Sequence, residues 1–197
     1  MLRFVESIKI KDGITENIEY HNRRFESTML SIFKSTGKID LADLIQVPEE
    51  YTAGVYKCRV VYSSKIEKIE FDAYQKRNIR TVKLVYDNKI DYSFKYENKS
   101  SLDRLKSLHP DYDDVLIVKN GLVTDSSFSN VAFFNGTEWH TPAAPLLRGT
   151  RREKLISEGF ILPVEIQPDD IQRYTKISFI NAMLDLGESE TDIHSIK

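Results

Sequence analysis

The amino-acid sequence predicts an α+β fold. Short runs rich in Val, Ile and Tyr, which favour β-strands, recur along the chain. Residues 19–34 instead carry apolar side chains at helical spacing, and Gly37 lies just past their end. Strands and helices do not alternate in the regular manner of a doubly wound sheet, and this irregular order favours α+β over α/β.

Local signals place the individual elements. Asp-Gly and Asn-Gly pairs mark tight turns between strands, and a glycine after an apolar helical pattern marks a helix end. The last ten residues carry no such signals and are expected to fray. In chain order, the sequence predicts a strand at 2–10 ending at Asp12-Gly13, a helix at 19–34, a short element at 41–45, strands at 55–62, 66–74 and 81–86, a helix at 101–108, a strand at 115–118 turned by Asn120-Gly121, strands at 131–134 and 138–140 around Asn135-Gly136, a helix at 150–158 stopped by Gly159, a strand at 163–166, a short helix from Pro168 and a strand at 177–180.

The chain is long enough for one large domain or two small ones, with 197 residues. A break near residues 88–96 predicts a smaller N-terminal part, residues 1–90, and a larger C-terminal part, residues 91–197. Hydrophobic content is 41%, charged content is 29% and the formal charge is −2, as in globular proteins without a general attraction to nucleic acid or anionic membranes. The start of the chain lacks a signal-peptide core, and no apolar run reaches membrane-spanning length, so we expect a cytoplasmic protein.

Cysteine and histidine give no sign of a metal or a disulfide. Cys58 is the single cysteine, and it is interpreted as a small buried hydrophobe on a strand. The four histidines are scattered without ligand-like spacing, so no metal site is expected.

The chemistry is concentrated in residues 121–152 and in one upstream lysine. Asp125 is a carboxylate just after a hairpin turn, and Asn130 begins the next strand. The run from Gly149 leads into a helix, and Lys95 lies upstream in a loop. An amine, an acid that can pair with a ring nitrogen and a helix N-terminus that can bind phosphate together suit a phosphorylated aldehyde cofactor.

These motifs resemble those of the class IV aminotransferases, the fold-type IV pyridoxal-phosphate enzymes. This family includes branched-chain and D-amino acid aminotransferases and 4-amino-4-deoxychorismate lyase. The resemblance extends from about Phe4 to Asp185 and is densest between Lys95 and Arg152. It implies a two-subdomain fold like that of D-amino acid aminotransferase, with pyridoxal 5′-phosphate (PLP) between the subdomains. It also implies a homodimer and a small substrate that carries an amino group.

The resemblance assigns the two central catalytic groups. Lys95 is similar to the family's Schiff-base lysine, which also has an Asn three residues later; the alternative is an exposed lysine in a polar loop. Asp125 follows Gly121-Leu122-Val123-Thr124, where the family has Gly-x-Val-Thr-Glu and the glutamate pairs with the pyridine nitrogen. Asp is one methylene shorter than Glu, and the alternative is an Asp that caps a turn.

Further residues resemble the family's cofactor-binding positions. Gly149-Thr150-Arg151 is similar to Gly-Ile-Thr, where backbone N–H groups bind the phosphate and glycine allows a close approach. Here the Thr lies one position early, and the alternative is an ordinary helix start. The resemblance also assigns the Ser129-Asn130 pair that opens a strand, in which Asn130 is interpreted mainly as structural, and Asn181, which could instead simply end a strand.

Arg24 resembles the arginine that binds the phosphate in the family's His-Leu-x-Arg-Leu motif. The adjacent Arg23 is the alternative candidate for this role. Upstream of it, Glu6-Ser7-Ile8-Lys9 resembles the family's Glu-Thr-Ile-Arg strand, with an ordinary half-exposed strand as the alternative.

The substrate-binding parts of the family are less well matched. Strands that normally precede the Glu-Thr-Ile-Arg strand are missing, as is the Arg-Gly loop that recognises a substrate carboxylate. Arg59 is a candidate replacement, although it could merely pack its stem on the sheet. An aminotransferase must bind two carboxylate substrates in turn, so the loss of these parts would harm it more than it would harm a lyase. These departures therefore favour a lyase like 4-amino-4-deoxychorismate lyase over a branched-chain or D-amino acid aminotransferase. A non-catalytic relative is a third hypothesis.

Overall fold

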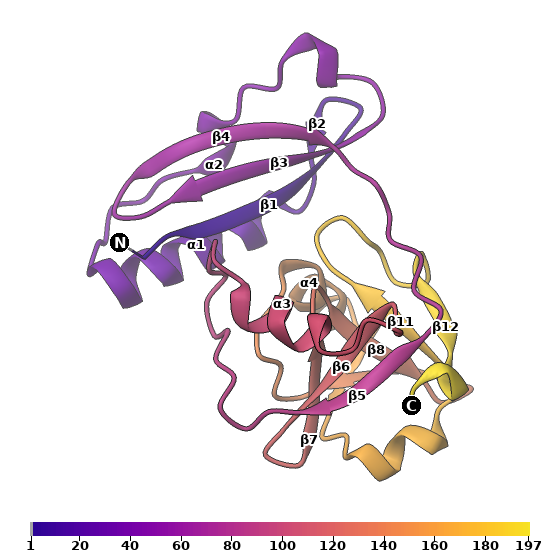
Figure 1. The fold of residues 1–197 in the computed structure, drawn as a ribbon. Helices are drawn as coiled ribbons and strands as arrows, with labels where there is room; N and C mark the ends of the chain where they lie inside the picture. Colours follow the sequence, from indigo (N-terminus) through magenta and orange to yellow (C-terminus); the bar gives the residue numbers. More distant parts are fainter. Residues whose placement is uncertain (1) are drawn as a thin grey trace. The chain divides into compact units, whose positions relative to one another are not determined.

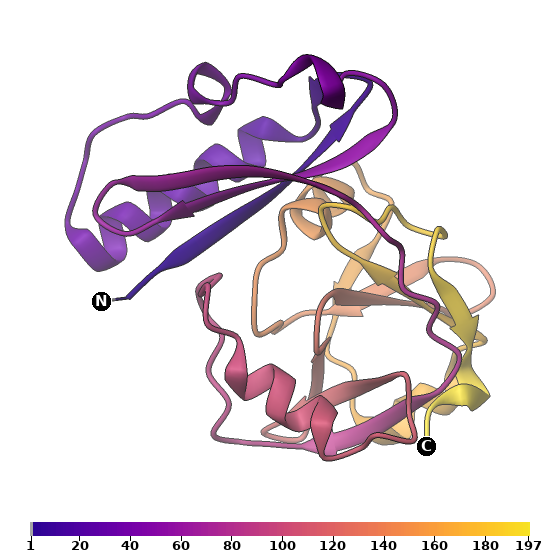
Figure 2. The same ribbon diagram turned by 45° about the horizontal axis from the view of Figure 1, so that its top comes forward.

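The computed structural model describes residues 2–197, and these residues form two compact units (Figure 1). The first unit contains the residues up to Gln75 and the segment Phe94–Asn98; the second contains Lys76–Ser93 and Lys99–Lys197. This division differs from the predicted break at residue 90. The reason is that β5 (Val82–Tyr86) pairs in parallel with β6 (Asp114–Lys119), as Figure 2 shows, while the segment around Lys95 pairs with the start of β1 (Phe4–Lys11).

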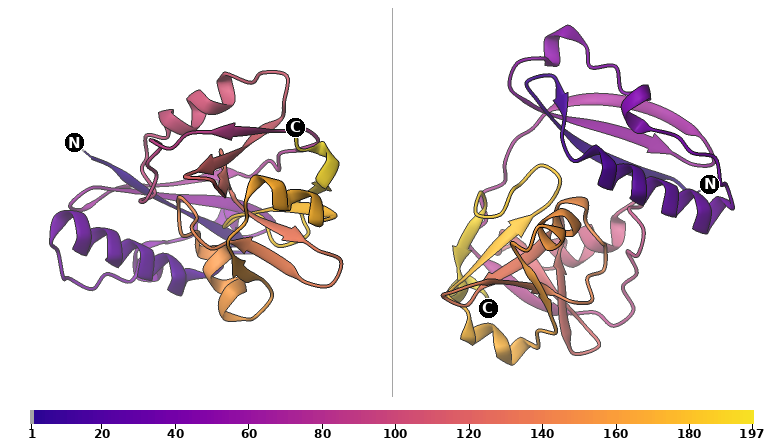
Figure 3. Two further views of the ribbon diagram at one scale, coloured as in Figure 1. Left: turned by 90° about the horizontal axis from the view of Figure 1, so that it is seen from below. Right: turned by 180° about the vertical axis from the view of Figure 1, so that it is seen from behind.

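The first unit is a four-stranded sheet covered on one face by a long helix (Figure 3). Alternate side chains of β1, such as Phe4 and Ile8, pack against Phe25 and Met29 of the helix α1, as expected when one face of a strand meets an amphipathic helix. Cys58 is buried on β3, which confirms its interpretation. The strand order is β2-β1-β3-β4, and the elements are β1 (Phe4–Lys11), β2 (Ile14–Thr15), α1 (Ile18–Phe33), α2 (Leu41–Leu44), η1 (Glu49–Tyr51), β3 (Val55–Tyr62) and β4 (Ile66–Ala73).

The second unit contains two sheets, with strand orders β5-β6-β7 and β10-β9-β8-β11-β12. Buried residues of both sheets, among them Leu116, Phe133 and Phe179, form one hydrophobic core. Helix α3 (Ser100–Ser107) lies between β5 and β6 in the chain. The elements after β6 are β7 (Leu122–Ser126), β8 (Asn130–Phe134), β9 (Trp139–Pro142), α4 (Thr150–Ser157), β10 (Leu162–Val164), η2 (Pro168–Arg173), β11 (Lys176–Ile180), β12 (Glu190–Asp192) and η3 (Ile193–Ser195). The predicted α+β class is therefore confirmed.

The prediction that the last ten residues fray is wrong. β12 pairs with β11, and Ile193 is buried in the core of the second unit. The final residue, Lys197, donates its backbone N–H to the carbonyl of Val82 at 2.9 Å and accepts from Leu84 at 2.8 Å. The C-terminus therefore supplies hydrogen bonds to the edge strand β5, a long-range pairing that local sequence signals do not contain.

Candidate active site

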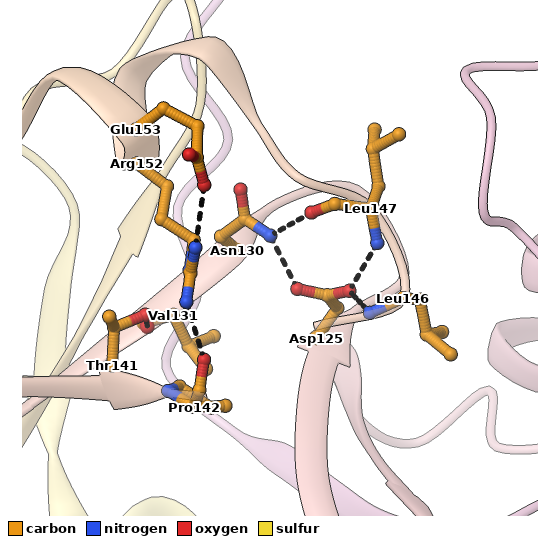
Figure 4. A network of polar contacts seen from close by, with 9 residues as sticks. All are labelled: Asp125, Asn130, Val131, Thr141, Pro142, Leu146, Leu147, Arg152 and Glu153. Atoms are coloured by element: carbon orange, nitrogen blue, oxygen red, sulfur yellow. Dashed lines mark hydrogen bonds and ion pairs between the residues drawn. The ribbon is translucent and has the colours of Figure 1, made fainter. Parts of the chain in front are cut away.

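The second unit contains a buried network centred on Asp125. This residue lies on β7 with 5% of its surface exposed, so it is not a turn cap. One carboxylate oxygen accepts a hydrogen bond from the Asn130 side-chain amide at 2.5 Å. The other accepts from the backbone N–H groups of Leu146 and Leu147 at 2.5 and 3.1 Å (Figure 4). Asp125 therefore ties the loop that precedes α4 to the sheet.

These contacts set the protonation of Asp125. Burial raises the pKa of its carboxyl group, and the hydrogen bonds from Asn130 and the loop amides only partly oppose that effect. The resulting pKa is about 6, compared with an ordinary value of 3.8. Asp125 is thus a buried anion at neutral pH that a neighbouring cation would stabilise.

Asn130, the first residue of β8, links Asp125 to the start of α4. Its amide also donates to the carbonyl of Leu147 at 2.8 Å. A β-carbon added to Gly149 would lie only 2.0 Å from the side-chain oxygen of Asn130, which is far too close for two non-bonded atoms. Gly149 has an ordinary extended backbone, with φ of −70°, so the glycine is required by the Asn130 side chain and not by its torsion angles. This adds a second reason for glycine to the close approach that the sequence suggests.

The Gly149→Ala variant should be destabilised by about 1–3 kcal/mol, because the added methyl group overlaps the Asn130 amide in a packed site. Urea unfolding of the purified variant measures this difference. Gly37→Ala is the matched control, since nothing lies within 4 Å of the β-carbon added there. Combining Gly149→Ala with Asn130→Ala should recover part of the loss; a double variant that shows the full sum of both losses would contradict the proposed overlap.

The N-terminus of α4 has the features of an anion site. Glu153 makes the first hydrogen bond of the helix, to the carbonyl of Gly149 at 2.9 Å. Within residues 2–197, no side chain caps this helix start. The N–H groups of a first helical turn have no carbonyl partner in the helix, and the helix dipole adds positive potential there. Thr150 and Arg151 are buried at this position, and Arg151 forms an ion pair with Asp185 at 2.7 Å.

Arg152 is a neighbour of this network. Its guanidinium donates to the carbonyl of Pro142 and to the carboxylate of Glu153, both at 2.8 Å (Figure 4). Its charge also lowers the pKa of Asp125, which places it close enough to act on that carboxylate electrostatically.

Ser129 and Asn181 make local contacts. The hydroxyl of Ser129 lies 2.9 Å from that of Ser126, in the turn between β7 and β8. The side-chain oxygen of Asn181 accepts from the backbone N–H of Met183 at 2.9 Å, just after β11. Both residues belong to the second unit, and their contact with a cofactor stays a prediction.

The remaining predicted residues belong to the first unit. The backbone carbonyl of Lys95 accepts from Val5 at 2.9 Å, which fixes the lysine beside β1, and its side chain is half-buried. Arg24 donates through Nε and Nη2 to the two carboxylate oxygens of Glu6, at 2.9 and 2.5 Å. His21 Nδ1 lies 2.6 Å from the same carboxylate.

Arg59 is held by carboxylates of its own unit. It forms ion pairs with Glu70 at 3.1 Å and with Glu97 at 3.6 Å. Glu97, two residues after Lys95, also lies 3.7 Å from Arg3. Because two carboxylates already balance its charge, a role for Arg59 in binding a substrate carboxylate would require one of these pairs to open.

Comparison with known proteins identifies the family. The amino-transferase class IV family matches residues 3–188. An uncharacterized protein of Haemophilus influenzae is 37% identical over 185 residues, covering 93% of this chain and 98% of the relative. The chain belongs to the class IV aminotransferase family.

Solved structures of similar proteins agree with this assignment. A Haemophilus somnus protein provisionally named 4-amino-4-deoxychorismate lyase is 33% identical, with a TM-score of 0.87 over 94% of this chain and 98% of that chain. The PLP-bound form of a hypothetical aminotransferase from Mycobacterium tuberculosis has a TM-score of 0.75 over 99% of this chain and 81% of that chain. Its 16% identity shows a common fold alone.

Two features of this family member were not assigned a role from its sequence. Glu6 and His21 form a buried cluster with Arg24, and Arg152 acts on Asp125. The inward position of Glu6 in an alternating strand was the available signal. Among residues 2–197, no cluster of three His, Cys, Asp or Glu side chains could hold a metal ion, and no helix has the length and apolar character to cross a membrane.

Proposed function

We propose that this member of the class IV aminotransferase family uses PLP to cleave 4-amino-4-deoxychorismate into 4-aminobenzoate and pyruvate. The connection from buried Asp125 through Asn130 to the start of α4 carries the PLP part of the proposal. The choice of reaction is supported by the likeness, at 33% identity and over nearly the whole of both chains, to the provisionally named lyase of Haemophilus somnus.

The residues of the second unit fit such a cofactor. The buried Asp125 anion has its pKa raised by burial, so a protonated pyridine nitrogen would be a favourable partner. The start of α4, with no capping side chain among the described residues, suits a phosphate group. Asn130 contacts both Asp125 and Gly149, so it fixes the position of the carboxylate relative to the start of α4.

PLP, when bound, draws electron density from the substrate carbon that carries the amine. The ionised Asp125 would keep the ring nitrogen protonated, and the start of α4 would hold the phosphate. Arg24 of the first unit stays a predicted phosphate ligand. Lys95 Nζ accepts the proton from the amine-bearing carbon and donates a proton to the departing enolpyruvate carbon. The net change is an elimination that leaves an aromatic ring, so all substrate atoms appear in the two products and no oxidant is needed.

An aminotransferase acting on branched-chain or D-amino acids is the second candidate, and the family membership favours it. That reaction needs a keto acid to collect the amine, whereas the lyase reaction needs none. The two candidates therefore differ in their co-substrate. A non-catalytic family member would carry out neither reaction.

The purified protein supplied with PLP should release pyruvate from 4-amino-4-deoxychorismate without any added keto acid. A coupled lactate dehydrogenase assay measures the pyruvate, and chromatography measures 4-aminobenzoate in equal amount. Amine transfer from glutamate or a branched-chain amino acid to a keto acid, with no pyruvate from the chorismate derivative, would instead support the aminotransferase. A protein that leaves the absorbance spectrum of added PLP unchanged and has neither activity would contradict both.

A further inference from the structure

The Arg151–Asp185 ion pair of the second unit joins two segments that are far apart in the sequence. Arg151 lies in the first turn of α4, and Asp185 follows the turn after β11. The two side chains meet at 2.7 Å, with 7% of the arginine and 38% of the aspartate exposed. Because a buried charge is costly unless a partner balances it, Asp185 stabilises Arg151 at the start of α4.

A tight turn leads from β11 to Asp185. The backbone N–H of Asn181 donates to the carbonyl of Leu184 at 3.2 Å, and the N–H of Leu184 donates back at 3.0 Å. The Asn181 side chain closes the turn by accepting from the backbone N–H of Met183 at 2.9 Å. Met183 and Leu184 are both buried. The turn is therefore well fixed, and Asp185 has a defined position from which it reaches Arg151.

This turn begins beside the Asp125 network. Strands β11 and β8 are antiparallel neighbours, and Ile180 pairs in register with Asn130. Asn130 in turn contacts Asp125 through its amide and lies against Gly149 at the start of α4. Two separate contacts therefore link the turn after β11 to the start of α4: the strand pairing through Asn130 and the ion pair with Arg151.

The first turn of α4 carries more positive charge than a helix start favours. The helix dipole already places positive potential at this end, where acidic side chains are the stabilising ones. Arg151 and Arg152 are nevertheless both buried there. Burial and the nearby charge of Arg148 both lower the pKa of Arg152, and its buried Nε has no hydrogen-bond partner among residues 2–197. Buried cations at the positive end of a helix indicate that an anion binds there.

We propose that the Arg151–Asp185 pair is a specificity determinant for the phosphate of PLP, an inference that rests on the proposed function. Arg151 supplies a buried positive charge at the phosphate site, and Asp185 is a positioning residue that keeps this charge at the start of α4. The attraction between this charge and a phosphate acts through space and requires no vacant N–H group. Because Asp185 is partly exposed, water screens its repulsion of the phosphate.

The test compares two probes on the apo-protein: PLP, and pyridoxal, which lacks the phosphate. Titration followed by absorbance gives the dissociation constant of each, and their ratio measures the preference for the phosphate. Arg151→Gln should reduce this preference about tenfold and leave the affinity for pyridoxal nearly unchanged. Arg151→Lys retains the charge and should keep most of the preference. Asp185→Asn should reduce the preference about threefold, and the double variant should lose little more than Arg151→Gln alone.

Arg173→Gln is the matched control. Arg173 also pairs with an aspartate of the second unit, Asp170 at 2.8 Å, but it lies in η2 and 77% of its side chain is exposed. This variant should keep the wild-type preference. If Arg151→Gln does not fold, Asp185→Asn provides the test at a partly exposed position.

Two kinds of failure can be told apart. A folded Arg151→Gln protein that keeps the wild-type preference would overturn the inference, as would an Asp185→Asn protein whose preference is unchanged or higher. Wild-type protein that binds pyridoxal as tightly as PLP would overturn the inference and leave the proposed reaction standing. Wild-type protein that binds neither probe would overturn the proposed function together with the inference.

Discussion

Replacing Lys95 with glutamine should abolish covalent attachment of PLP and lower the rate of pyruvate release by about 10³-fold or more, because in the proposed reaction the amine would serve as both nucleophile and proton carrier. Glutamine keeps a similar length and polarity, and the backbone bond that fixes residue 95 to Val5 does not involve the side chain. Borohydride treatment followed by peptide mass analysis detects attachment, and steady-state pyruvate release measures the rate.

Lys89→Gln is the control for this experiment. Lys89 is an exposed lysine on the approach to the same loop, and its backbone N–H donates to Asp87. This variant should retain both PLP attachment and activity. Borohydride trapping at another lysine in the Lys95→Gln protein, with the rate preserved, would show that residue 95 is an ordinary loop lysine.

Local sequence signals predicted those parts of the fold that local interactions determine. The Asp12-Gly13 turn has positive φ at both residues, 49° and 79°, as a tight hairpin requires. The strand predicted at residues 55–62 has the bounds of β3, and the helix at 150–158 closely matches α4. In each case the alternation, turn residue or helix stop lies within a few residues of the element that it specifies.

Long-range contacts could not be predicted in this way. The bonds of Lys197 to β5 join residues more than a hundred positions apart. The same limit applied to the site: the motif around Asp125 indicated a functional carboxylate, but not its bonds to the amides of Leu146 and Leu147. Nor did the sequence show that Gly149 makes room for Asn130, because that contact depends on how a hairpin and a loop pack together.

Asp125 should make the stability of the apo-protein fall as pH rises from about 4 to about 6. Burial raises the pKa of this carboxyl group from 3.8 to about 6, so the folded state holds a proton in this range that the unfolded state has released. The stabilisation is fully present below pH 3.8 and is lost as pH rises through about 6. A difference of two pKa units corresponds to about 3 kcal/mol in the free energy of unfolding.

The Asp125→Asn variant isolates this contribution, since other groups titrate equally in both proteins. Asn places an N–H₂ group against the donating amide of Asn130, which should lower stability at every pH. Apart from this constant difference, the free energies of unfolding of the two apo-proteins, measured with urea between pH 4 and pH 7, should converge as the wild-type carboxyl group ionises. Curves that stay parallel would mean that Asp125 keeps an ordinary pKa in the folded protein, and that its pairing with a ring nitrogen would relieve no buried charge.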